Sequence, residues 1–166
     1  MVGLVSSVAL FWPGALRGML PTTRLGFRLA RWAPWLLTLL ARRTASRPDE
    51  FLARLREQLP ECDRRVLARP EVAEVSAGSA AEALSTDEMG REMVLLRRDW
   101  QFAPSDVAVP TALWHGELDR NVPVTHGHRL AAALRDCRAT FITDAGHYLV
   151  FDHWHAILSA MTADRF

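Results

Sequence analysis

The segment from Val107 to His147 constrains the fold more than any other part of the chain. Its apolar run Val107–Trp114 predicts a strand that is buried on both faces. A helical pattern begins at Pro123, and a second run of β-branched and aromatic residues covers Thr140–Thr143. Strand, helix and strand in this order predict a right-handed βαβ unit with two parallel strands.

A polar residue of chemical interest follows each of these strands. Asp119 lies in the turn after the first strand, and His147 follows the second. Parallel strands end at one edge of a sheet, where open α/β sheets place their chemistry, so the two side chains are expected to emerge together. A carboxylate bonded to one imidazole nitrogen fixes the tautomer and leaves the other nitrogen able to take a proton.

The motifs around both residues resemble the C-terminal part of the α/β-hydrolase family. They are Leu113–Asp119 (LWHGELD) with Val122-Pro123, and Asp144–His147 (DAGH) followed by a helix. In that family the catalytic residues follow the chain order nucleophile, acid, histidine. The resemblance implies that Asp119 is the acid and His147 the general base.

Other interpretations of these positions stay open. Asp144 and Glu117 are rival acids, but Asp144 ends the histidine's own strand and is the poorer partner for it. His147 could also be a purely structural histidine. The preceding Gly146 and the strand before it favour the catalytic type of position.

The sequence contains no recognisable nucleophile elbow. Gly-x-Ser-x-Gly does not occur, and the nearest segment, Ala77–Ala80 (AGSA), has no strand before it. No His-Gly-Gly-Gly segment supplies an oxyanion hole. We therefore expect a truncated hydrolase, inactive alone, that needs an N-terminal half to act on a small-molecule substrate through an ester, amide or related bond.

The first residues predict a buried strand, Val2–Leu10, which ends at the turn Trp12–Gly14. This strand resembles the one before the cap insertion of the family. No positive region precedes the apolar run and no clear cleavage site follows it, so a secretory signal is not indicated. A cytoplasmic location is the expectation.

About four helices are predicted between the first strand and the βαβ unit. Apolar residues recur at helical intervals over 25–40, with a kink or break at Pro34. Another helix is predicted from Ser46–Asp49 to Pro60, and a capping box at Ser85–Glu88 predicts a third. The segment Val75–Ala83 is interpreted as a loop or weak helix.

Together these elements predict a partial α/β-hydrolase fold of the α/β class. A remnant parallel sheet of about three strands carries an inserted cap, and a helix over Leu149–Met161 packs back on the sheet. The expected division is core over 1–16, helical cap over 17–103 and core over 104–166. Such a cap covers the site and sets substrate choice in the resembled family.

The cap region is rich in arginine. Between Arg17 and Arg69 the sequence has 12 Arg and five acidic residues, and Trp32 and Trp35 lie among them. Such a helix can bind a membrane surface or an anionic substrate. We favour the interpretation of a solvated Arg face with Trp packed against the body, so membrane binding is not the expectation.

Metal and cofactor binding are not predicted. The pairs His126-x-His128 and His153-x-His155 are spaced so that their members do not face each other on a helix. Surface or capping roles are favoured for them. Cys62 and Cys137 match no metal or redox spacing, which indicates two reduced thiols.

Composition limits the remaining function classes. A length of 166 residues fits one domain or part of a larger one, and the net charge of +1 argues against nucleic-acid binding. All 20 basic residues are Arg, which is typical of a GC-rich bacterial genome. A bare sheet edge would invite self-association, so a non-catalytic interaction or membrane-surface module is the alternative function.

Overall fold

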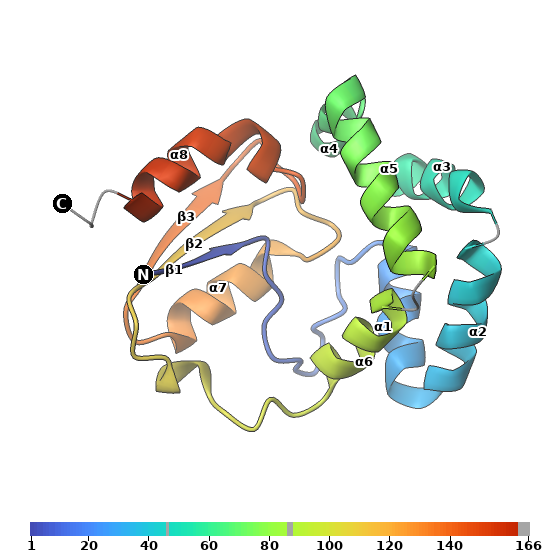
Figure 1. The fold of residues 1–166 in the computed structure, drawn as a ribbon. Helices are drawn as coiled ribbons and strands as arrows, with labels where there is room; N and C mark the ends of the chain where they lie inside the picture. Colours follow the sequence, from blue (N-terminus) through green and yellow to red (C-terminus); the bar gives the residue numbers. More distant parts are fainter. Residues whose placement is uncertain (46, 86–87, 163–166) are drawn as a thin grey trace.

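The computed structural model describes residues 1–45, 47–85 and 88–162. Three strands form a parallel sheet in the order β1-β2-β3, with α7 and α8 on its two faces and the helical cap α1–α6 beside it (Figure 1). The fold class is therefore α/β, as the sequence predicts. The strands are β1 (Val2–Val5), β2 (Thr111–Gly116) and β3 (Cys137–Ile142). The helices are α1 (Pro21–Trp32), α2 (Pro34–Ala45), α3 (Pro48–Gln58), α4 (Glu61–Leu67), α5 (Pro70–Ser85), α6 (Glu88–Arg97), the 3₁₀ turn η1 (Pro104–Asp106), α7 (Val124–Ala133) and α8 (Val150–Thr162).

β2 is the central strand and is buried along its whole length. Its side chains alternate between the two faces, as the pleat requires. Ala112 and Trp114 pack with Leu149 and Ile157 on the α8 side. Leu113, on the opposite face, packs with residues that include Leu130 of α7. These two small cores fix the sheet between its helices.

All three predicted strands have different bounds in the structure. The strand predicted over Val2–Leu10 ends at Val5, because Ser6 has a φ of 47° that turns the chain out of the extended conformation. The strand predicted from Val107 begins only at Thr111, after η1 and after Pro110, which lacks an amide proton for the ladder. β3 begins at Cys137, before the predicted Thr140.

The cap contains six helices among the described residues, more than predicted. The helix pattern over 25–40 breaks at Pro34, as expected. The segment Val75–Ala83, predicted as a loop or a weak helix, is helical and lies inside the 16-residue helix α5. Its alanines and glutamates are strong helix formers. Ser46 and much of the predicted capping box at 85–88 lie outside the described residues.

The packing predicted for the cap tryptophans is wrong. Trp32 and Trp35 are 80% and 70% exposed. The buried side of α1 is formed by other residues, which include Phe27 and Ala30, and the break at Ala33–Pro34 leaves both indoles on the outer side. None of the helices in the described part of the chain is long and apolar enough to span a membrane.

Candidate active site

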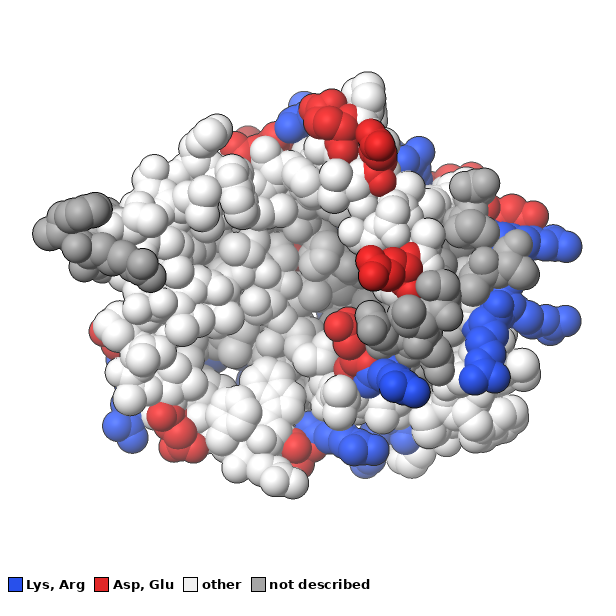
Figure 2. Space-filling view, in the orientation of Figure 1, with Lys and Arg blue, Asp and Glu red and all other residues white. Residues whose placement is uncertain are grey.

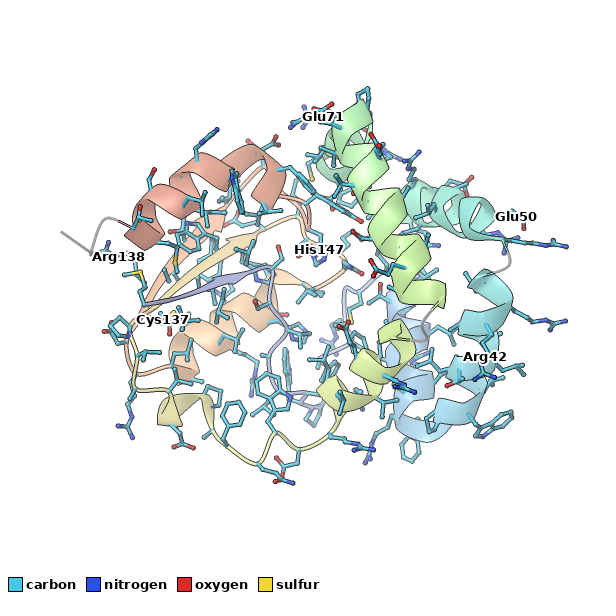
Figure 3. The ribbon with its side chains drawn as sticks, in the orientation of Figure 1. Arg42, Glu50, Glu71, Cys137, Arg138 and His147 are labelled. Atoms are coloured by element: carbon cyan, nitrogen blue, oxygen red, sulfur yellow. The ribbon has the colours of Figure 1, made fainter. Side chains whose placement is uncertain are left out.

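Asp119 and His147 meet at the carboxyl end of the sheet. Nδ1 of His147 lies 2.9 Å from Oδ2 of Asp119, although 28 residues separate them in the chain. β2 and β3 end beside each other, which brings together the two loops that carry these side chains. Figure 3 shows His147 at the end of the sheet that faces the cap.

Backbone amides hold the Asp119 carboxylate in place. Its Oδ1 accepts hydrogen bonds from the amides of Asn121 and Val122, each at 2.8 Å. The residue is 3% exposed, so these donors replace the water that a buried carboxylate loses. Oδ2 is thereby left directed toward the imidazole.

The imidazole of His147 is held in one orientation. Because Oδ2 of Asp119 can only accept, Nδ1 of His147 donates to it and Nε2 carries the free lone pair. No described residue bonds Nε2, and the side chain is 26% exposed. Burial opposes the charged form, but Asp119 outweighs it with help from Asp63, so the pKa of His147 is raised above its ordinary value.

A second histidine, His115, lies close to the Asp119 carboxylate. Nε2 of His115 donates to the Val122 carbonyl at 2.8 Å and lies 3.6 Å from Oδ2 of Asp119. The His115 side chain is fully buried, and burial lowers its pKa, so it stays neutral. A Cβ on Gly127 would lie 2.8 Å from the His115 ring, so α7 approaches this closely only with glycine there.

Asp63 of α4 completes the site and is not among the residues predicted from the sequence. Its Oδ2 accepts from the His147 amide at 3.1 Å, and its Oδ1 accepts from the Tyr148 amide at 3.0 Å. Asp63 is 1% exposed. One signal could have found it: Asp63 precedes the buried Val66 and Leu67 by one helical turn, which places a carboxylate on an apolar face.

The histidine loop therefore lies directly against the cap. A Cβ on Gly146 would overlap the Asp63 carboxylate, so the loop reaches Asp63 only with glycine at this position. Arg69 of the cap also forms an ion pair with Asp152 of α8. On the sheet side, the Ser6 hydroxyl donates to the His147 carbonyl at 3.2 Å. The loop is thus held from both sides.

We expect Asp63→Asn to lower the pKa of His147 and to destabilise the protein. The amide would remove a negative charge that favours the imidazolium, and its NH₂ group would face a backbone amide that needs an acceptor. The expected loss in free energy of unfolding is about 1–3 kcal/mol. An NMR titration of His147 measures the first effect and urea unfolding the second; an unchanged His147 pKa would contradict this account.

The alternative residues considered from the sequence form no hydrogen bond with His147 among the described residues. Asp144 and Glu117 are exposed, and neither forms a hydrogen bond with His147 within the described part of the chain. Ser79 lies inside α5 rather than on a strand-to-helix turn. A cavity of about 200 Å³ beside Asp63 and Asp144 does not include His147 in its lining. This cavity therefore does not expose Nε2 of His147.

The structure corrects the role expected for one histidine. His126 is fully buried rather than on the surface: Nδ1 accepts from the Ala9 amide at 3.1 Å and Nε2 donates to the Ala15 carbonyl at 2.9 Å. The His128 ring lies against the Phe141 ring, with 4.0 Å between the ring centres. Within the described residues, no group of three or more His, Cys, Asp or Glu side chains is arranged to hold a metal ion.

Solved structures share this architecture. A hydrolase from Pseudomonas aeruginosa PA01 matches with a TM-score of 0.60 and 17% identity, over 97% of this chain and 53% of that one. An α/β-hydrolase enzyme from a Medee basin deep-sea metagenome library matches with a TM-score of 0.52 and 13% identity, over 97% and 54%. The chain has about half of an α/β-hydrolase fold. No family profile and no curated protein matches the sequence significantly.

A third hydrolase structure matches over similar shares of the two chains. The 2-hydroxy-6-oxo-6-phenylhexa-2,4-dienoate hydrolase from Rhodococcus sp. strain RHA1 matches with a TM-score of 0.56 and 17% identity, over 98% of this chain and 53% of that one. The chain thus spans about half the length of these hydrolase structures. Three parallel strands and a helical cap make up the shared part.

Proposed function

We propose that this chain carries the acid and the general base of a Ser-His-Asp-type hydrolase. Asp119 is the acid, His147 is the base, and the nucleophile comes from outside these 166 residues. The 2.9 Å contact between His147 Nδ1 and Asp119 Oδ2, with Nε2 unbonded by described residues, is the observation that carries the proposal. The substrate class is a small molecule with an ester, amide or related bond.

The proposed chemistry follows from the tautomer. Nε2 of His147 takes the proton of the nucleophile's hydroxyl as the oxygen attacks the carbonyl carbon, and it then gives that proton to the leaving group. Asp119 stabilises the imidazolium in between and remains ionised. The acyl group is then bonded to the nucleophile's oxygen. Water attacks this ester and gives a proton to Nε2, which passes it to the nucleophile's oxygen as the acid product leaves.

We expect the isolated chain to hydrolyse an activated ester no faster than its His147→Ala variant. No described side chain lies bonded to Nε2 of His147, so no nucleophile is activated. The measurement is turnover of a chromogenic ester by the unaltered chain and by the variant. Robust turnover that His147→Ala abolishes would show that this chain supplies its own nucleophile.

The DNA upstream of the Met1 codon offers an independent test. We expect this DNA to encode a strand–Gly-x-Ser-x-Gly–helix segment, in frame or in a separate reading frame. Expressed with this chain, that segment should restore ester hydrolysis. Restored activity must be lost on His147→Ala. If no such segment restores activity, the catalytic proposal fails.

The exposed sheet edge favours a second candidate, a non-catalytic interaction module. β1 pairs only with β2, and its outer edge faces no further strand among the described residues. Val2 is 42% exposed, whereas parallel strands are usually covered on both faces. Figure 2 shows few charged side chains over the strands. A defined oligomer without hydrolase activity, even after complementation, would favour this candidate.

A further inference from the structure

The outer corner of the cap exposes two large aromatic side chains that are close together in the sequence. Trp32 ends α1 and is 80% exposed, and Trp35 lies in the first turn of α2 and is 70% exposed. Leu39, one helical turn after Trp35, is 50% exposed. Indoles exposed to this degree gain little from the packing of the chain itself, so a stability role does not explain them.

Arginines surround these apolar side chains. Arg28, Arg31 and Arg42 are exposed on the same two helices, and the Arg31 guanidinium lies 5.1 Å from the Trp32 ring centre. We name the surface formed by Arg28, Arg31, Trp32, Trp35, Leu39 and Arg42 the Trp–Arg corner. Figure 3 shows Arg42 on α2, on the side of the cap away from the sheet.

The charged side chains of the corner itself all have the same sign. Residues 1–48 contain seven arginines and no Asp or Glu, and the first acidic residue of the chain is Asp49. Among the described residues, no carboxylate forms an ion pair with Arg28, Arg31 or Arg42. The corner therefore presents positive charge next to apolar surface.

We propose that the Trp–Arg corner docks the protein on the surface of an anionic phospholipid bilayer. Tryptophan favours the boundary between headgroups and acyl chains, because its ring is apolar and its N–H needs a polar partner. Arginine binds lipid phosphates while its alkyl stem stays near the apolar layer. The helices lie on the surface, since no described helix can cross the bilayer.

A second exposed apolar stripe lacks this chemistry. Phe151, Trp154 and Leu158 of α8 are exposed, but α8 contains the acidic Asp152 and no arginine. Asp152 is itself paired with Arg69. The α8 stripe therefore has no positive charge of its own to attract an anionic surface, and it serves as a matched control.

The experiment is co-sedimentation of the 166-residue chain with vesicles of phosphatidylcholine alone or mixed with phosphatidylglycerol. We expect binding to the mixed vesicles at low salt, weaker binding at high salt and little binding to phosphatidylcholine. The double variant Trp32→Ala/Trp35→Ala should bind at least about tenfold more weakly. Trp154→Ala, which removes an indole that is 51% exposed on α8, should bind like the unaltered chain.

Two pairs of Arg→Gln substitutions separate electrostatic attraction to the lipid from nonspecific adsorption. Arg28→Gln/Arg42→Gln should weaken binding to the mixed vesicles by on the order of tenfold. Arg135→Gln/Arg138→Gln, at exposed positions near and on β3, should leave it unchanged; Figure 3 shows Arg138 on the opposite side of the molecule from Arg42. Circular dichroism and thermal unfolding confirm that every variant is folded.

Three outcomes would overturn the proposal. The first is no binding of the folded, unaltered chain to the mixed vesicles. The second is binding that Trp154→Ala removes, or that Trp32→Ala/Trp35→Ala leaves intact. The third is self-association that depends on Trp32 and Trp35 without vesicle binding, which would assign the corner to a protein contact.

Discussion

Asp119→Ala is expected to reduce the free energy of unfolding by about 3–5 kcal/mol. The substitution removes the acceptor for the backbone amides of Asn121 and Val122 and the partner of His147. The Val122 amide is buried and the other two donors are partly buried, and a buried donor left without an acceptor costs more free energy than an average hydrogen bond contributes. Urea unfolding of the two proteins measures the difference.

Asp144→Ala is the matched control for this substitution. Asp144 stands in the histidine loop, three residues before His147, but its side chain is exposed. We expect its removal to change stability by less than about 0.5 kcal/mol. Equal effects of the two substitutions would mean that Asp119 is not the carboxylate that organises this edge of the sheet.

Gly116→Ala is expected to destabilise the protein by about 3 kcal/mol, through overpacking. A Cβ at this position would overlap the Ala145 carbonyl oxygen and lie 2.5 Å from that of Gly146. Both are backbone atoms, so no side-chain rotation relieves the clash. The histidine loop must move away from β2, and His147 moves with it.

Gly78→Ala separates this clash from the general effect of replacing glycine. Gly78 lies inside α5, and a Cβ added there would have no neighbouring heavy atom within 4 Å. Alanine at this position should therefore stabilise the helix by about 0.5–1 kcal/mol. Thermal or urea unfolding compares the two substitutions. If Gly116→Ala lowers the free energy of unfolding no more than Gly78→Ala does, the histidine loop does not pack closely against Gly116 of β2.

The βαβ unit and the meeting of Asp119 with His147 could be predicted because the sequence pattern is local. Apolar runs separated by a helical pattern determine parallel strands, and the ends of parallel strands place the two loops together. The exact strand ends could not be predicted in this way. β1 ends at Val5 because the next residue, Ser6, has a backbone conformation that no apolar pattern reveals.

Asp63 and the two cap tryptophans show where local patterns fail. Asp63 contributes to the site only because the cap folds back onto a loop 84 residues later, and no spacing rule predicts that contact. Packing is the natural prediction for Trp32 and Trp35, since large aromatics are usually buried to a high degree. Their exposure follows from how α1 and α2 meet at Pro34, which is a tertiary feature.

The tautomer and pKa of His147 in the unaltered chain test the central claim most directly. Histidine-selective nitrogen NMR across a pH titration reports both. We expect a neutral form protonated at Nδ1 and a pKa above the ordinary histidine value of about 6.5, with Asp119→Asn reversing both. A neutral form protonated at Nε2 would contradict the account, because Nε2 could not then serve as the base. A pKa at or below that value would also contradict it, because Asp119 would then not stabilise the imidazolium.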